Sequence, residues 1–191
     1  MKEKTIRAVV MGASAGAIDA LSSILPHLSR EYRLPILIVV HLPSERDSAL
    51  IDVFAQKCQL SVKEAEEKTF PEGGTIYFSP PDYHLLVEPD FSLSLSSEEP
   101  VLYCRPSIDV LFETAAEAYG ESLCGIILTG ANEDGALGLN AVAARGGTAV
   151  VQNPQTAFSP AMPLAALASC PEAVSMNLEE ITTFLKDIGE E

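Results

Sequence analysis

The sequence predicts an α/β protein with a three-layer, doubly wound and mostly parallel sheet, to which an antiparallel hairpin is added. Short apolar runs rich in β-branched residues alternate with stretches of helical periodicity, and this order is typical of parallel strands joined by helices. The 191 residues show no repeat, low-complexity stretch or linker. A chain of this length can bury one good core, so we expect a single domain over residues 1–191.

The first half begins with two strand–helix pairs. The runs IRAVVM and LPILIVVH are short, apolar and β-branched, which indicates buried strands. The expected elements are a strand at 6–11, a helix at 17–28, a strand at 34–41 and a helix at 48–58. In the first helix one face should carry the apolar side chains Ile18, Leu21, Ile24, Leu25 and Leu28.

The middle of the chain, from 61 to 104, has short extended pieces broken by turn residues. Pro80-Pro81-Asp82 and Glu88-Pro89-Asp90 are typical turn sequences. We expect an antiparallel hairpin here, with about 84–88 pairing against 91–96.

The alternation then resumes and continues to the end of the chain. Pro106 fits the first turn of a helix that runs to about Tyr119, and Gly120 fits its end. Asn177 begins the last helix, with Glu180 three positions on in capping-box spacing. Between these helices we expect a strand at 122–130, a helix near 135–145, a strand at 148–152, a helix within 159–170 and a short strand within 172–176.

Composition excludes several classes of protein. The formal charge of −15 repels nucleic-acid phosphates and anionic membranes, and no basic patch is present. No apolar stretch approaches the ~20 residues of a membrane span, so we expect a cytoplasmic protein without membrane insertion. No CxxC motif occurs, so the cysteine spacing predicts neither a zinc site nor a redox pair. Cys124 lies inside an apolar run and should be in the core.

Three polar residues follow three of the predicted buried strands. Ser14 lies in GASAG after the first strand, His41 ends the second, and Asp134 follows the strand at 122–130. In open parallel sheets, sites form beyond the carboxyl ends of the strands, so these side chains should lie close together. A hydroxyl, an imidazole and a carboxylate are the groups of an acyl-transfer triad. In such a triad serine attacks, histidine accepts its proton and aspartate orients the imidazole.

Each of these residues also has a purely structural interpretation. GASAG can be a tight strand-to-helix turn without chemistry, and His41 can be a hydrogen-bonded residue at a strand end. Asp134 can be the N-cap of the helix that follows it. The two other histidines fit structural roles, His84 on the hairpin surface and His27 in an amphipathic helix.

Four blocks, GASAG, VVHLP, RPSIDVLF and GIILTGANEDGALG, resemble the catalytic domain of the chemotaxis protein-glutamate methylesterases (CheB type). The resemblance runs from about Arg7 to about Ile188. It implies hydrolysis of glutamate γ-methyl esters on the cytoplasmic domains of methyl-accepting chemoreceptors, with related glutamine deamidation and no cofactor. By motif, it implies that Ser14 is the nucleophile, His41 the general base and Asp134 the orienting carboxylate.

The sequence departs from the family pattern at several positions. Ala15 replaces a common threonine, Cys104 stands where histidine is common, and Ala131 stands where methionine is usual. The segment 44–48 is more charged than in the family. The chain also begins with the catalytic domain and not with a receiver domain, so we expect a stand-alone enzyme, with any regulation supplied by a partner in trans.

Two other functions compete with the esterase. One is a phosphate- or nucleotide-binding module that uses GASAG as its turn, but GASAGA lacks the first G-x-G pair of a dinucleotide fingerprint. In addition, the second strand ends in His41 and not in an acidic residue. The other is a catalytically inactive homologue that only docks to receptors. The presence of Ser14, His41 and Asp134 argues against that loss.

Overall fold

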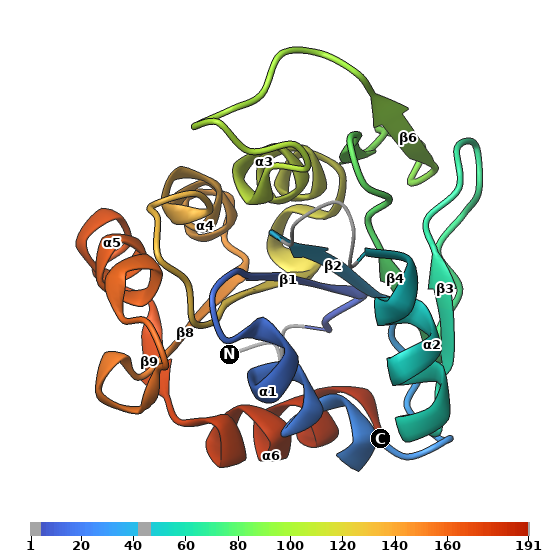
Figure 1. Cartoon of the computed structure of the whole chain (residues 1–191), viewed down its shortest axis with the longest axis horizontal. Coiled ribbons are helices and arrows are strands. Elements are labelled where there is room, and N and C mark those ends of the chain that lie inside the picture. Colours follow the sequence, from blue (N-terminus) through green and yellow to red (C-terminus); the bar gives the residue numbers. More distant parts are fainter. Residues whose placement is uncertain (1–4, 42–46, 191) are drawn as a thin grey trace.

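The centre of the protein is a seven-stranded parallel sheet with the strand order β3-β4-β2-β1-β7-β8-β9 (Figure 1). The structure is a computed structural model that describes residues 5–41 and 47–190. The strands of this sheet are β1 (Ala8–Ala13), β2 (Ile36–Val40), β3 (Ser61–Glu64), β4 (Thr75–Phe78), β7 (Leu123–Ile127), β8 (Thr148–Gln152) and β9 (Val174–Met176).

Helices cover both faces of the sheet, as the predicted doubly wound fold requires. The described helices are α1 (Ala17–Ser22), α2 (Asp47–Lys57), α3 (Ile108–Tyr119), α4 (Ala136–Ala144), α5 (Ala161–Ser169) and α6 (Leu178–Gly189). One core cluster joins α1, α2 and α6 to the sheet, and a second joins α3, α4 and α5 to the opposite face. Figure 1 shows the two helix layers with the strands between them.

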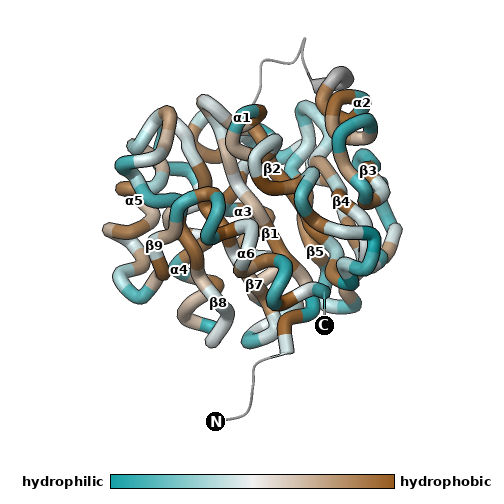
Figure 2. Tube along the Cα trace, turned by 90° about the horizontal axis from the view of Figure 1, so that it is seen from below, coloured by the Kyte–Doolittle hydropathy of each residue, from teal (hydrophilic) through white to brown (hydrophobic). Residues whose placement is uncertain are grey.

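The central strands β1, β2 and β7 are buried along their whole length. Successive side chains of β1 alternate between the two core clusters: Val9 and Met11 face one, and Ala8 and Val10 face the other. Hydrophobic residues therefore concentrate along these strands (Figure 2). This pattern explains why the strand sequences are continuous apolar runs and not alternating ones.

The hairpin and the final helix form as predicted. Strands β5 (His84–Val87) and β6 (Leu93–Ser96) make a separate antiparallel pair that packs beside α3. Asn177 caps α6 with both bonds of a capping box. Its Oδ1 accepts from the Glu180 N–H at 2.9 Å, and Glu180 Oε2 accepts from the Asn177 N–H at 2.7 Å.

Two helix predictions need correction. The helix expected at 17–28 ends at Ser22, and a short 3₁₀ helix, Leu25–His27, follows it. Pro26 lacks the N–H that a continuous α-helix would need there. Ile18, expected on the buried face, is 38% exposed.

The third helix begins later than expected. Ser107 is its N-cap and accepts from the Val110 N–H at 3.5 Å, so Pro106 precedes the helix instead of opening its first turn.

Two of the short extended pieces of the middle section join the main sheet. They are β3 and β4, and both run parallel to its other strands.

No helix within the described ranges combines the length and apolarity needed to cross a membrane.

Candidate active site

Ser14 lies in the turn between β1 and α1. Its backbone N–H donates to the Thr129 carbonyl at 2.9 Å, which ties this turn to the segment after β7. Gly16 has a φ of 83°, and a Cβ there would lie 2.6 Å from Cβ of Phe158. A side chain at this position would therefore be strained and would also clash. The serine is half-buried at the sheet edge, in the sharp strand-to-helix turn that the glycines predict.

His41 is the first residue after β2, and the register of the sheet brings it next to Ser14. Ala13 pairs with Val40 in the parallel ladder, so Ser14 and His41 are the next residues along two neighbouring strands. The His41 N–H donates to the Ala13 carbonyl at 3.1 Å. The His41 side chain is 12% exposed, so one side of the imidazole is accessible while the backbone is held by the sheet.

Asp134 is a buried carboxylate with four hydrogen-bond donors around it. Its Oδ2 accepts from His41 Nε2 at 2.9 Å and from the Ile108 N–H at 2.6 Å. Its Oδ1 accepts from Ser107 Oγ at 2.8 Å and from the Asp109 N–H at 3.0 Å. Three of the four donors belong to the N-terminal end of α3, where the helix dipole favours a negative charge.

The surroundings of Asp134 keep it ionised. Burial acts to raise the pKa of this carboxyl, but the hydrogen bonds from His41 and from the backbone N–H groups of Asp109 and Ile108 lower it below its ordinary value. A carboxylate accepts but cannot donate, so it fixes the neutral His41 tautomer with the proton on Nε2. The lone pair of Nδ1 is then free to accept a proton.

The alternative role of Asp134, as a cap for the helix after it, does not occur. Gly135 is the N-cap residue of α4 and caps with no side chain. Asp134 instead accepts hydrogen bonds from the N-terminal end of α3. This helix lies beside Asp134 in space but precedes it in the sequence. No local sequence pattern indicates this arrangement, because Asp134 is 25 to 27 residues away in the sequence from the α3 groups that it binds.

Asn132 and Cys104 surround the other ring nitrogen of His41. The Asn132 amide nitrogen lies 3.3 Å from His41 Nδ1 and 3.4 Å from Cys104 Sγ, and Cys104 Sγ lies 3.7 Å from Nδ1. Within the described residues, Ser14 Oγ makes no hydrogen bond to His41. Strand-end reasoning did not point to Asn132. The only signal for Cys104 was its departure from the family pattern.

His84 is buried and not on the hairpin surface as predicted. Its exposed fraction is 2%. Its Nδ1 accepts from the Ser107 N–H at 3.1 Å, and its Nε2 donates to the Glu99 carbonyl at 3.1 Å. The hairpin turns this residue inward because β5 packs against α3. His84 therefore anchors the segment between β6 and α3 that carries Cys104.

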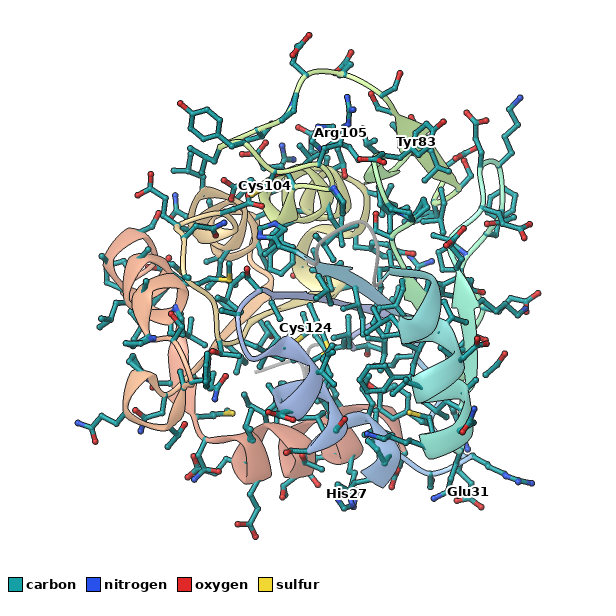
Figure 3. All side chains as sticks on the ribbon, viewed as in Figure 1. His27, Glu31, Tyr83, Cys104, Arg105 and Cys124 are labelled. Atoms are coloured by element: carbon teal, nitrogen blue, oxygen red, sulfur yellow. The ribbon has the colours of Figure 1, made fainter. Side chains whose placement is uncertain are left out.

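The other positions that the sequence indicated lie beside this site, apart from it, or outside the described residues. His27 is exposed and lies on the opposite side of the molecule from Cys104 (Figure 3). Cys124 is in the core, as expected. Ala131 is exposed beside the site. Of the charged segment 44–48, residues 44–46 lie outside the described residues.

The site also holds a group of possible metal ligands. One ligand atom of His41, one of Cys104 and one of Asp134 all lie within 4.8 Å of one another. These residues are far apart in the sequence, so no cysteine spacing indicates them.

Sequence comparison places the chain among proteins with named activities. A family model described as CheB methylesterase matches residues 9–185. The chain is 46% identical over 174 residues to a Leptospira interrogans protein provisionally named protein-glutamate methylesterase/protein-glutamine glutaminase, and the match covers 91% of this chain and 90% of that protein.

Other relatives are longer. The chain is 37% identical to the protein-glutamate methylesterase/protein-glutamine glutaminase 1 of Carboxydothermus hydrogenoformans, covering 83% of this chain and 48% of that protein. It is 32% identical to a protein of the same activity name from Archaeoglobus fulgidus, covering 93% of this chain and 53% of that protein. The chain thus spans about half the length of these two relatives.

A solved structure has the same fold. The crystal structure of the Thermotoga maritima CheB methylesterase catalytic domain superposes with a TM-score of 0.89 at 28% sequence identity. The match covers 96% of this chain and 98% of that one.

Proposed function

The chain belongs to the CheB methylesterase family, and from this premise we propose that residues 1–191 form one methylesterase catalytic domain. The activity is that of a protein-glutamate methylesterase, a hydrolase that cleaves glutamate γ-methyl esters and releases methanol. The same chemistry on a glutamine side chain releases ammonia, and the names of the relatives carry both activities. The proposed substrates are methylated glutamates on the cytoplasmic domains of methyl-accepting chemoreceptors, and the proposed location is the cytoplasm.

The proposed catalytic residues are Ser14, His41 and Asp134. The observation that carries this assignment is the 2.9 Å hydrogen bond between His41 Nε2 and the buried Asp134 carboxylate. His41 directly follows β2, and Ser14 directly follows the neighbouring strand β1. Asp134 orients His41, His41 takes the proton of Ser14, and Ser14 Oγ attacks the ester carbonyl carbon. The same imidazole then gives the proton to the departing methanol, and water hydrolyses the acyl-enzyme.

The proton must travel through Nδ1 of His41, because Asp134 holds Nε2. In the structure the Asn132 amide donates toward Nδ1 at 3.3 Å. In the proposed reaction the Ser14 hydroxyl takes the place of this amide when the ester binds. Catalytic hydrogen bonds often tighten only in the substrate complex, and the missing Ser14–His41 bond is consistent with that behaviour.

Two backbone groups are suited to stabilise the oxyanion of the tetrahedral intermediate. In the described part of the chain, the N–H groups of Ala15 and Ala131 donate to no other group. Ala15 follows the proposed nucleophile directly, which is the usual place for one oxyanion donor in a strand–turn–helix elbow. Ala131 belongs to the segment after β7, and the Ser14 N–H to Thr129 carbonyl bond ties that segment to the Ser14 turn.

Cys104 is the competing nucleophile, because its Sγ lies 3.7 Å from His41 Nδ1. The protonation state of its thiol argues against that role. Burial raises the pKa of the Cys104 thiol, and the nearby negative charge of Asp134 raises it further. The thiolate is therefore scarce at neutral pH. Ser14 also has the flanking glycines and the adjacent free N–H that a nucleophile elbow needs.

The test is methanol release from a receptor fragment that carries glutamate γ-methyl esters. Ser14→Ala should lower kcat/KM by roughly 10⁴-fold, since the loss of a triad member typically has that effect. Ser23→Ala is the matched control. Ser23 is exposed at the end of α1 and its hydroxyl bonds only the Asp19 carbonyl. A serine-directed phosphonate should label Ser14 in the wild-type chain.

The results also separate the alternatives. If Ser14→Ala retains the wild-type rate and Cys104→Ala loses it, the nucleophile is Cys104. A chain that binds the receptor fragment but releases no methanol is a docking homologue. Binding of inorganic phosphate at the GASAG turn without esterase activity would favour the phosphate-binding module.

A further inference from the structure

Two groups with affinity for transition metals lie next to each other on the side of the His41 ring that is turned away from Asp134. One is the Nδ1 lone pair, which is available because the Nε2 proton is held by Asp134. The other is Cys104 Sγ, 3.7 Å from Nδ1. Neutral imidazole and thiolate are the preferred ligands of zinc, so their pairing at one point is a chemically specific arrangement.

The distance between these atoms fits two ligands of one ion. Zinc–sulfur and zinc–nitrogen bonds of about 2.3 Å and about 2.05 Å at a tetrahedral angle place the two ligand atoms about 3.6 Å apart. At the observed separation of 3.7 Å, these two ligand atoms themselves need almost no movement. The Asn132 amide, 3.3 Å from Nδ1 and 3.4 Å from Sγ, lies against both atoms and would have to yield to an ion.

Asp134 supports the proposed ligand His41 through a hydrogen bond and is not itself a metal ligand. A histidine that binds zinc usually donates its other ring N–H to a carboxylate, which fixes its tautomer and orientation. Asp134 provides that bond at 2.9 Å and is fully buried. Its two oxygens are already occupied by four donors, so it has little capacity left for a metal.

We propose that His41 Nδ1 and the Cys104 thiolate bind one Zn²⁺ ion, with water at the remaining positions, and that the bound ion inhibits the enzyme. On binding, the thiol proton of Cys104 is released to water and a zinc–sulfur bond replaces it. Inhibition follows because the ion occupies the nitrogen that must accept the Ser14 proton. The inhibition rests on the proposed function, whereas the binding does not.

The other cysteines offer no equivalent pair within the described residues. Cys124 is buried near the centre of the molecule, away from Cys104 (Figure 3), and Cys170 is also buried. Cys58 is half-buried at the end of α2 with no histidine in hydrogen-bond contact. Cys58→Ser is therefore the matched control for Cys104→Ser.

The binding experiment uses Co²⁺ as a spectroscopic substitute for zinc on the purified chain. We expect a sulfur-to-cobalt charge-transfer band that saturates at one equivalent and disappears when Zn²⁺ is added. Cys58→Ser should keep the band, and Cys104→Ser should lose it. His41→Ala should weaken Co²⁺ binding by at least about tenfold. Circular dichroism confirms that each variant is folded, and Cys104→Ala provides a second test of the same position.

The outcomes distinguish the two proposals. The metal site is wrong if the wild-type chain shows no band, or if the band persists in both Cys104 variants. In the activity assay, one equivalent of Zn²⁺ should inhibit methanol release by the wild type, and Cys104→Ser should need at least about tenfold more zinc. Metal binding without inhibition overturns the inhibitory role. A band in a chain that shows no methanol release without metal refutes the esterase and leaves the site standing.

Discussion

Asp134 is the residue on which the proposed site depends most, because its four partners are all donors. Asp134→Asn keeps the size of the side chain but places an NH₂ group against two of those donors. We expect kcat/KM to fall by roughly 10⁴-fold, since the amide favours the wrong His41 tautomer. The free energy of unfolding should fall by about 3 kcal/mol through broken buried hydrogen bonds, which urea denaturation measures.

The matched control is Asp187→Asn, an exposed substitution on α6. It should change neither the rate nor the urea midpoint appreciably. Wild-type stability and activity in Asp134→Asn would show that the four hydrogen bonds do not hold the site together.

At this scale the sequence predicted Ser14, His41 and Asp134 as neighbours because parallel strands end at one edge of a sheet. Asn132 and Cys104 could not be predicted in the same way. Cys104 lies in an irregular segment whose path depends on contacts between residues far apart in the sequence, such as the bonds of His84 to the Ser107 N–H and the Glu99 carbonyl. Such contacts leave no periodic signal in the sequence.

Helices α3 and α4 are joined by a second buried carboxylate, Asp109, whose Oδ1 accepts from the Gly138 N–H at 2.7 Å. Burial raises the pKa of Asp109 to about 6 from an ordinary value of 3.8. Because the pKa of Asp109 is higher in the folded state than in the unfolded one, the protonated carboxyl stabilises the fold. This contribution to the free energy of unfolding is fully present below pH 3.8 and is lost as the pH rises through about 6. Asp109→Asn should remove this dependence and still accept from Gly138.

We therefore expect Asp109→Asn to be more stable than the wild type at pH 8, by up to about 3 kcal/mol. The difference should shrink toward pH 4. Urea denaturation of both proteins at several pH values tests this, and a difference that is constant with pH would contradict it.

The close approach of α3 and α4 depends on Gly138. A Cβ at this position would lie 2.6 Å from Cβ of Phe112 and 3.0 Å from Cα of Asp109. We expect Gly138→Ala to lower the free energy of unfolding by about 1–3 kcal/mol, because the helices must separate. Asn140→Ala, an exposed substitution on the same helix, is the control. Equal thermal midpoints for the two variants would show that the helices accommodate a methyl group.

Elements with strong local signals were predicted well, and elements fixed by distant contacts were not. The capping box at Asn177 and the apolar strands are examples of the first kind. The pairing of β3 with β4 is an example of the second, since its register depends on a strand that follows a long turn region. The early end of α1 shows how Pro26 outweighed the apolar periodicity that suggested a longer helix.

The whole molecule carries a formal charge of −15, with 27 acidic and 12 basic residues. Its electrostatic field should therefore repel anionic substrates and attract cationic ones. For two otherwise matched γ-methyl ester peptides, we expect kcat/KM of the acidic peptide to rise with salt and that of the basic peptide to fall. The comparison spans about 0.01 M to about 0.15 M ionic strength, over which the Debye length falls from about 30 Å to about 8 Å. Identical salt responses would show that the local charge at the site outweighs the net charge.

The proposed catalytic residues follow β1, β2 and β7, which lie side by side in the middle of the sheet, while β3 and β9 form its edges and are partly exposed. In native-state hydrogen exchange, the edge strands should open at low free-energy cost and the three middle strands only in global unfolding. Fraying of the edges then leaves the proposed catalytic residues in place. Loss of activity in urea should accordingly coincide with the cooperative unfolding transition and not precede it, so that the enzyme assay itself becomes a measure of the population of fully folded molecules.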